Sequence, residues 1–367
     1  MAQQVNTAEM YPYISGILAR TGDEVRVGGT VQDNQVFDSQ ETTTFNWDYG
    51  ISNPKLRQLY ERAKSAQWNG SDLPWDTDVD LEKPIFDVDP ALAGADWFRK
   101  LDAKERQRIT IEYNANQISQ FVHGEQGALL AASQLTTAVP EADGKFYAAS
   151  QTFDEARHVE VFSRYAREKL DRMYPCTQNL FNLIKAVAVE SRWDFKFLGM
   201  QLVVEGLAIS AFITMLQRCR EPLFAELIRY VLRDEARHVA FGVISLSDYY
   251  NEMNEKERRE RQEFVYEACV LMRGRLFSAE AYDRMGIDRS KMADTMRGSK
   301  EINDFRALLF SQIVPNMKKA GLLNGWLEER FAEMEVLKFK DYDADAVLNS
   351  LIAGSSEHSP DARPAVG

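Results

Sequence analysis

The hexapeptide DEARHV occurs twice in this chain, at residues 154–159 and again at residues 234–239. Two of the four histidines lie in these repeats. In each repeat a Glu precedes a His by three residues, a spacing that places both side chains on one face of a helix. A carboxylate oxygen and an imidazole nitrogen on one helical face can bind the same metal ion. The repeat therefore predicts two metal-binding helices.

Two further glutamates follow the same spacing. Glu125 precedes Glu155 by 30 residues, Glu205 precedes Glu235 by 30 residues, and the two halves are offset by 80 residues. Each glutamate lies within an apolar helical stripe, so all four are expected to face the core. Unpaired buried carboxylates cost on the order of several kcal/mol each and repel one another. Two divalent cations would balance four carboxylates and two neutral imidazoles, which predicts a metal pair held by Glu125, Glu155, His158, Glu205, Glu235 and His238.

The elements that must position these residues are helical. Residues 1–100 are irregular in composition, with five prolines, and their longest helix candidate covers residues 55–68. From Asp102, a plausible N-cap, the apolar residues recur with a 3.6-residue period. This period predicts helices at about 102–137, 142–173, 193–218 and 222–253, with a connector near 179–190. Further helices are predicted at about 255–285, 300–320, 323–336 and 343–353. The predicted fold class is all-α, a four-helix bundle with additional helices.

The composition narrows the classes of function. The chain has 367 residues, 45% of them hydrophobic, which is enough for a large core. No stretch approaches the roughly 20 uncharged apolar residues of a membrane span, and the first ten residues do not resemble an export signal. The net charge of −12 disfavours nucleic acid as a partner. Cys176, Cys219 and Cys269 lack CxxC spacing and are expected to be free thiols in a cytoplasmic protein.

The motif set resembles the ferritin-like di-iron carboxylate superfamily, in which a lone Glu from each of two helices and an ExxH from each of the other two form the metal site. This superfamily includes bacterial multicomponent monooxygenases, acyl-carrier desaturases, arylamine N-oxygenases, benzoyl-CoA epoxidases and the radical-bearing subunit of ribonucleotide reductase. The resemblance implies that Asp154 and Asp234 orient the metal-bound imidazoles, and that Arg157 and Arg237 hold the aspartates. It also implies a cofactor of two iron ions, or of manganese and iron, with O2 as co-substrate.

The resemblance covers about residues 100–255 and divides the chain into four parts. We predict an irregular N-terminal extension (1–100) packed on the bundle, the di-iron bundle (101–255), C-terminal helices (256–353) and a disordered tail (354–367). One ion is expected at Glu125, Glu155 and His158, and the other at Glu205, Glu235 and His238, with two of the glutamates bridging.

Several positions depart from the better-known family patterns. Phe162 replaces the radical tyrosine of ribonucleotide reductase subunits. Ile209 and Ala208 replace the threonines that serve O2 activation in hydroxylases and desaturases. Val231 replaces the additional histidine of arylamine N-oxygenases, so a plain six-ligand site is expected. His123 lies on another helical face from Glu125 and is expected to be a packing or surface histidine.

Small and polar residues beside the glutamates leave two questions open. Gly124, Gly127 and Gly206 either make room for O2 or substrate, or allow close helix packing. Gln201 and Ser210 are the nearby polar side chains that remain for proton delivery.

The function predicted from the resemblance is an O2-activating di-iron monooxygenase or oxidase that acts on a small organic substrate. Two external electrons would come from a ferredoxin or a flavin reductase, and the superfamily suggests a homodimer. The first alternative is a metal-radical subunit of a ribonucleotide reductase-like complex. The second is a ferroxidase or iron-handling protein, although the flanks of about 100 residues on each side are long for that class.

Overall fold

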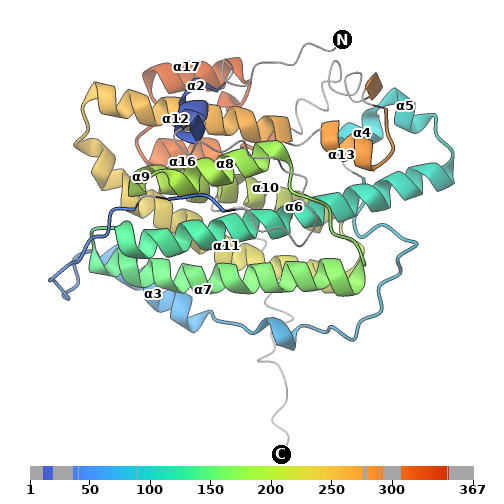
Figure 1. The fold of residues 1–367 in the computed structure, drawn as a ribbon, viewed down its shortest axis with the longest axis horizontal. Coiled ribbons are helices and arrows are strands. Elements are labelled where there is room, and N and C mark those ends of the chain that lie inside the picture. The colour runs from blue at the N-terminus through green and yellow to red at the C-terminus, as the bar shows by residue number, and fades with distance from the viewer. Residues whose placement is uncertain are drawn as a thin grey trace, which may run out of the picture.

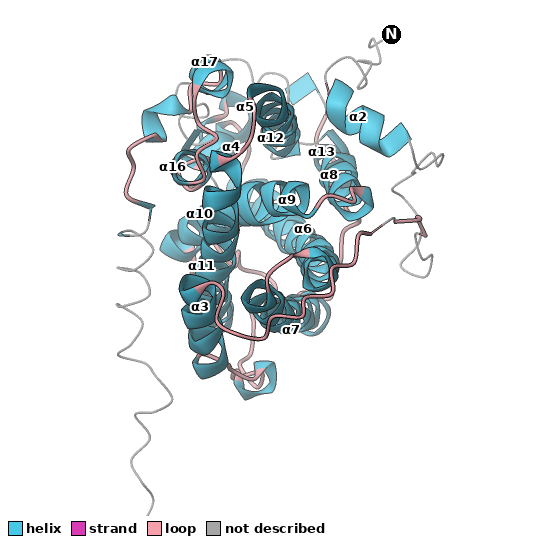
Figure 2. Cartoon of the chain, turned by 90° about the vertical axis from the view of Figure 1, so that its left-hand side faces the viewer, coloured by secondary structure: helices cyan, strands magenta, loops and turns pink. Residues whose placement is uncertain are grey.

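The computed structural model of the chain describes residues 11–19, 36–39, 41–88, 90–275, 279–288, 290, 291, 307–344 and 346. Long helices run side by side along its longest axis (Figure 1) and are seen nearly end-on in Figure 2. Among the described residues, the only extended pairing is one antiparallel bridge between Phe86 and Cys219. The predicted all-α fold class is confirmed.

Two helical hairpins form the bundle. Its helices are α6 (Ala103–Ala138), α7 (Ala142–Arg164), α10 (Glu205–Arg218) and α11 (Pro222–Asn251). α6 begins after Asp102, whose side chain accepts a hydrogen bond from the backbone N–H of Glu105, as an N-cap residue does. α11 begins after Glu221, which accepts hydrogen bonds from two backbone N–H groups of the first turn. The four long helices predicted from the periodicity are present.

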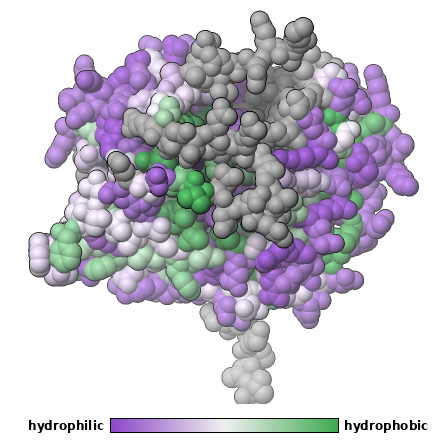
Figure 3. Space-filling model, viewed as in Figure 1, coloured by the Kyte–Doolittle hydropathy of each residue, from purple (hydrophilic) through white to green (hydrophobic). Residues whose placement is uncertain are grey.

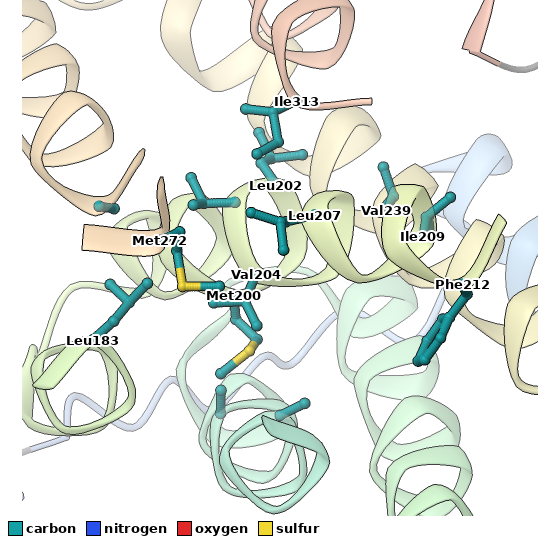
Figure 4. Close-up of a cluster of buried hydrophobic side chains, with 14 of the residues drawn as sticks. Leu183, Met200, Leu202, Val204, Leu207, Ile209, Phe212, Val239, Met272 and Ile313 are labelled. Atoms are coloured by element: carbon teal, nitrogen blue, oxygen red, sulfur yellow. The ribbon is translucent and has the colours of Figure 1, made fainter. Parts of the chain in front are cut away.

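The segment before α10 is a π-helical stretch. α9 (Trp193–Phe197) continues into η3 (Leu198–Val204), which joins α10 directly before Glu205. Its side chains project to several sides and meet neighbouring helices all round (Figure 4). The segment Trp193–Arg218 is long and apolar enough to cross a membrane, but most of it is buried inside the protein. It is therefore explained as the core helix of the bundle.

The second predicted helix ends earlier than expected. α7 is followed by a π-helical turn, η2 (Tyr165–Lys169), and the chain then leaves the helix at Asp171, whose φ is 49°. The connector α8 (Gln178–Val189) lies where the sequence predicts it. Because the left-handed backbone of Asp171 does not fit an α-helix, the helix ends before the predicted residue 173.

The first hundred residues contribute helices that pack on the bundle. They are α2 (Pro12–Ala19), α3 (Pro54–Ser65), η1 (Gly70–Asp72), α4 (Pro90–Gly94) and α5 (Asp96–Arg99). α3 lies against α7 and α11. The buried Asp143 on α7 ties the start of α3 down, because it accepts hydrogen bonds from the backbone N–H groups of Ser52 and Asn53 and pairs with Arg57 at 2.6 Å.

The C-terminal helices follow the prediction in part. They are α12 (Glu255–Arg275), α13 (Ala279–Arg284), α16 (Ile313–Lys319), α17 (Gly325–Glu333) and η4 (Leu337–Phe339). The single helix predicted over 255–285 is two helices, and residues 276–278 lie outside the described ones. The helix predicted over 300–320 is described only from residue 307. Residues 307 and 308 are helical, a turn follows at 309–312, and α16 then begins, with Pro315 in its first turn. α17 confirms the helix at 323–336.

Other predictions fall wholly or mostly outside the described residues. These are the last helix (343–353), apart from residues 343, 344 and 346, and the tail (354–367). Cys176, Cys219 and Cys269 form no disulfide bond with one another, as predicted. On the face shown in Figure 3, hydrophilic residues dominate the rim and hydrophobic residues gather toward the middle.

Candidate metal centre

The six predicted ligands lie together in the middle of the bundle. Glu125 comes from α6, Glu205 from the start of α10, and the two Glu–His pairs from α7 and α11. All six side chains are buried. Two groups of ligand atoms each lie within 4.8 Å of one another, one from Glu125, Glu155, His158 and Glu235, the other from Glu155, Glu205 and His238.

Both histidines turn Nδ1 toward the carboxylates. Nδ1 of His158 lies 3.2 Å from Oε1 of Glu235 and 3.4 Å from Oε2 of Glu155. Nδ1 of His238 lies 3.0 Å from Oε1 of Glu155 and 3.8 Å from Oε2 of Glu235. Glu155 and Glu235 thus present one oxygen to each imidazole, as bridging carboxylates would. From the sequence, Glu235 and His238 are expected to bind the same ion. In the structure the Glu235 carboxylate lies closer to Nδ1 of His158 than to Nδ1 of His238.

Several ligand atoms of the cluster are unsatisfied within the described part of the chain. Five buried ligand atoms have no hydrogen-bond partner there: Oε2 of Glu155, Nδ1 of His158, Oε2 of Glu205, Oε2 of Glu235 and Nδ1 of His238. Each unsatisfied buried polar group costs about 1–3 kcal/mol, so five of them in two adjoining groups of ligand atoms call for partners such as metal ions. Carboxylate oxygens with one imidazole per ion suit iron or manganese. The residues present therefore fit a pair of such ions.

The pKa values of the cluster indicate that metal ions would replace bound protons. Burial and the charge of Glu235 raise the pKa of Glu125 to about 8, and the same two causes raise the pKa of Glu205 well above its ordinary value. Burial alone would lower the pKa of His158 and His238, but the surrounding carboxylates hold both well above the usual range. Without metal, protons must neutralise the cluster, and metal ions compete with those protons.

A buried aspartate accepts a hydrogen bond from the second ring nitrogen of each histidine. Nε2 of His158 lies 3.0 Å from Oδ2 of Asp234, and Nε2 of His238 lies 3.4 Å from Oδ2 of Asp154. The aspartate of each motif thus orients the histidine of the other motif. An imidazole that donates its Nε2 proton presents the lone pair of Nδ1 to the metal position.

Two arginines hold the aspartate pair in place. Arg157 donates from Nη2 to Asp154 at 2.6 Å and to Asp234 at 2.9 Å. Arg237 donates to the same two aspartates. Burial alone would raise the pKa of Asp234, but the hydrogen bond from His158 and the two guanidinium groups hold it well below its usual range. Both aspartates therefore stay ionised and keep accepting the imidazole protons.

Three polar side chains at the site were not predicted. Trp68 donates from Nε1 to Asp234 at 2.8 Å, and Gln67 donates from Nε2 to Asp154 at 3.1 Å. Both residues follow α3, far from the motifs in sequence. Gln151 lies one helical turn before Glu155, and its Nε2 is 3.0 Å from oxygens of both Glu155 and Glu205. That one-turn spacing is the only sequence signal that could have indicated Gln151.

Phe162 and Val231, which depart from the family patterns, lie in apolar surroundings, and His123 has a hydrogen-bond partner away from the cluster. Phe162 packs in an aromatic cluster with Phe121 and Phe212, at ring distances of 5.9 and 5.7 Å. Val231 is fully buried and offers no donor. Nε2 of His123 lies 2.8 Å from the carbonyl oxygen of Tyr174.

Of the two polar side chains proposed for proton delivery, Gln201 is fully buried, and neither polar atom of its amide has a hydrogen-bond partner among the described residues. Ser210 donates to the carbonyl of Gly206 at 3.3 Å and lies 3.5 Å from Oγ of Ser311. Gln201 is therefore the polar group with unused hydrogen-bonding capacity.

A small cavity of about 20 Å3 adjoins the cluster. Glu125, Glu205 and Glu235 form part of its wall. Of the two predicted roles for the glycines, room beside the metal centre and close helix packing, the structure supports a different one at different positions. A Cβ atom on Gly124, which lines the pocket, would meet nothing within 4 Å, whereas one on Gly127 would lie 2.7 Å from Ile184. Gly124 provides room and Gly127 allows close packing; a Cβ atom on Gly206 would also be tight, at 3.2 Å from Ile313.

An all-α bundle in which two hairpins bring a lone glutamate and a Glu–His pair each to a buried centre defines the ferritin-like di-iron carboxylate superfamily. The predicted superfamily is thus confirmed. Residues 52–321 match the profile of the family described as P-aminobenzoate N-oxygenase AurF, and the chain belongs to this family. The match extends beyond the bundle into α3 and α16, and it confirms the predicted enzyme class, a di-iron oxygenase or oxidase.

Solved structures similar to this chain are R2-like ligand-binding oxidases. One, with its metal cofactor reconstituted aerobically and after photoconversion, has a TM-score of 0.46 and 17% identity over 74% of this chain and 94% of that one. Another, a variant reconstituted anaerobically with a Mn/Fe cofactor, has a TM-score of 0.48 and 18% identity over the same shares. No curated protein matches the chain at a significant level.

Proposed function

We propose that this protein is an O2-activating di-iron oxygenase that oxidises a small organic substrate in the pocket beside its metal pair. The observation that carries the proposal is the set of five buried ligand atoms without a hydrogen-bond partner among the described residues, which lie in two adjoining groups with a small cavity against the same glutamates. Because the family is described by an arylamine N-oxygenase, oxygenation of an amine nitrogen is the first reaction to test.

When bound, two ferrous ions supply two electrons to O2. The residues of the chain prepare the site for that step. Asp154 and Asp234 keep the Nε2 protons on the imidazoles, so that both Nδ1 atoms stay available as ligands. Gln151 donates to two of the carboxylates and limits their rotation. The buried position of the cluster excludes bulk water, which strengthens every electrostatic interaction there.

Each turnover of an oxygenase requires two electrons from outside the site, and we propose a ferredoxin or a flavin reductase as their source. We further propose a cytoplasmic homodimer. The superfamily to which the chain belongs suggests the homodimer.

The alternative of a radical-generating subunit has no specific support in the structure. The position of its radical tyrosine is Phe162, which is fully buried among other phenylalanines and has no hydroxyl group. The second alternative is a ferroxidase, and the assay below distinguishes it from the proposed oxygenase.

Anaerobic loading with Fe(II) followed by O2 tests the proposal. We expect two irons per chain, a transient absorbance after mixing with O2, and an oxidised organic product when a reductase is supplied. Glu155→Ala should lose the metal pair, whereas Glu160→Ala, an exposed glutamate on the same helix, should keep it. Stable binding of a single ion contradicts the proposal. Repeated Fe(II) oxidation into a mineral without organic product would identify a ferroxidase.

A further inference from the structure

A short segment before α3 carries a dense group of exposed apolar side chains. We call residues 41–53 the aromatic arm; it contains no helix or strand, and it projects beyond the ends of α6 and α7 at the left of Figure 1. The exposed fractions of Phe45, Trp47, Tyr49 and Ile51 are 68, 81, 68 and 61%. Four of the eleven large hydrophobic side chains that are exposed in the described part of the chain thus lie within seven residues. Such a grouping marks a contact site, whereas single exposed apolar residues do not.

The polar side chains of the arm face the protein, and its apolar side chains face solvent. Oγ1 of Thr44 and Nδ2 of Asn46 donate, at 3.2 and 2.8 Å, to backbone carbonyls at the turn between α6 and α7. Phe45 lies between these two residues in sequence but is exposed, and its ring centroid is 4.7 Å from that of Trp47. This order is the reverse of the usual one, in which large apolar side chains are buried and polar ones are exposed.

Backbone hydrogen bonds hold the arm in this position. At one end the N–H of Thr44 donates to the last turn of α6, and at the other end the N–H groups of Ser52 and Asn53 donate to a buried carboxylate of α7. Within the arm, the carboxylate of Asp48 accepts a hydrogen bond from the N–H of Gly50 at 2.9 Å. The aromatic side chains are therefore presented on an ordered backbone, which lowers the entropy lost on binding.

The composition of the arm indicates a permanent protein contact. Asp48 is the only charged residue among residues 42–53. Interfaces of permanent homodimers are apolar, rich in aromatic residues and depleted of charge, whereas brief encounters with electron donors are small and steered by charge. An anionic membrane attracts basic segments, but the arm contains no lysine or arginine and the protein carries a net charge of −12. A second copy of this chain therefore fits the arm better than a redox partner or a membrane.

We propose that the aromatic arm is a dimer contact, which meets the arm of a second copy across a two-fold axis. A two-fold interface brings the same surface of both subunits together, so an uncharged strip can meet itself. An aromatic side chain has about 150–250 Å2 to bury, and at these exposures the three rings offer roughly 300–550 Å2 per subunit. That is about half of the roughly 800 Å2 per partner that a standard interface buries, which is enough for its apolar centre.

Sedimentation velocity of the purified full chain tests the contact. We expect the mass of two chains of 42.0 kDa each. Trp47→Ser should weaken the dimer about thirtyfold or more, because tryptophan is among the side chains that dominate interface affinity. Phe153→Ser, which removes a ring that is 62% exposed on α7, is the matched control and should leave the dimer intact. Circular dichroism confirms that both variants remain folded.

Cross-linking tests the arm-to-arm geometry. Thr43 is exposed on the arm, and Ser71 is exposed in η1. A short bifunctional maleimide should join Thr43→Cys chains into covalent dimers, and it should join Ser71→Cys chains no more than the unmodified chain, whose three native cysteines serve as the background.

Four results overturn the inference: a monomeric unmodified chain, a dimer that Trp47→Ser leaves intact, equal dissociation by Phe153→Ser, and a dimer that Thr43→Cys does not cross-link. Binding of a monomeric chain to phosphatidylcholine vesicles that is lost in Trp47→Ser would identify a membrane contact instead. The contact does not depend on the metal centre. Iron stoichiometry and O2 uptake are measured separately, so the proposed function and this inference fail independently.

Discussion

The crossed pairing of the motifs leads to a sharp prediction for Asp234→Asn. The substitution keeps the size of the side chain but replaces the acceptor of the His158 Nε2 proton, 3.0 Å away, by a neutral amide. Asp234 has no such contact with His238, the histidine of its own motif, which faces Asp154 instead. The affinity of the ion at His158 should therefore fall, although the substitution lies in the motif of His238.

The magnitude follows from the contacts. Loss of a carboxylate partner of a metal-bound imidazole costs about 10- to 100-fold in metal affinity, or about 1.4 to 2.7 kcal/mol. Asp234 also accepts hydrogen bonds from Arg157 and Trp68, and it is buried. Breaking a buried ion pair costs about 3–5 kcal/mol, and since Asp154 still pairs with Arg157, the free energy of unfolding should fall by about 3 kcal/mol.

Double-mutant cycles provide the assay, with metal affinity measured by anaerobic titration. In a His158→Ala background, Asp234→Asn should have little further effect on metal affinity, because its partner is already gone. In a His238→Ala background it should retain the whole effect. Asp154→Asn should show the opposite dependence. If Asp234→Asn is instead silent in the His238→Ala background, the crossed arrangement is wrong.

Three further outcomes follow from the structure. Removal of the metal by chelation should lower the melting temperature, because ions that bind only the folded state stabilise it; an unchanged melting curve would contradict a buried metal pair. Metal loading near neutral pH should release up to four protons, one from each of the two histidines and two glutamates whose pKa is raised. The metal affinity should therefore rise as the pH increases through about 8. Calorimetry in buffers of different ionisation enthalpy measures the number of protons released. Gly127→Ala should destabilise the fold by about 1–3 kcal/mol because its Cβ atom lies 2.7 Å from Ile184, and Gly124→Ala, by contrast, should leave denaturant midpoints nearly unchanged.

The convergence of the six side chains could be predicted because it depends on local rules. Spacing of three residues places each Glu–His pair on one helical face, and the 80-residue repeat relates two equal hairpins. Apolar periodicity then shows which face is buried. The ends of the helices were less predictable. The π-helical stretch before Glu205 and the left-handed backbone at Asp171, where the helical segment after α7 has ended, are not indicated by the apolar periodicity.

The surroundings of the ligands could not be predicted in this way. Trp68 reaches Asp234 across 166 positions of sequence, and nothing in the local pattern of either residue indicates the contact. The crossed pairing of aspartates and histidines depends on how the two hairpins face each other. Gly124 and Gly127 look alike in the sequence, and only the position of Ile184 separates their roles.

The repeat in the sequence does not produce two equal metal positions. Trp68 donates to Asp234 at 2.8 Å, whereas Gln67 donates to Asp154 at 3.1 Å, so the segment that follows α3 provides a different donor to each aspartate. The aspartate–histidine distance is also shorter on the side of His158, 3.0 Å against 3.4 Å. A closer carboxylate makes an imidazole a stronger ligand. The ion at His158 should therefore bind first, because the N-terminal extension breaks the symmetry that the repeated hairpins establish.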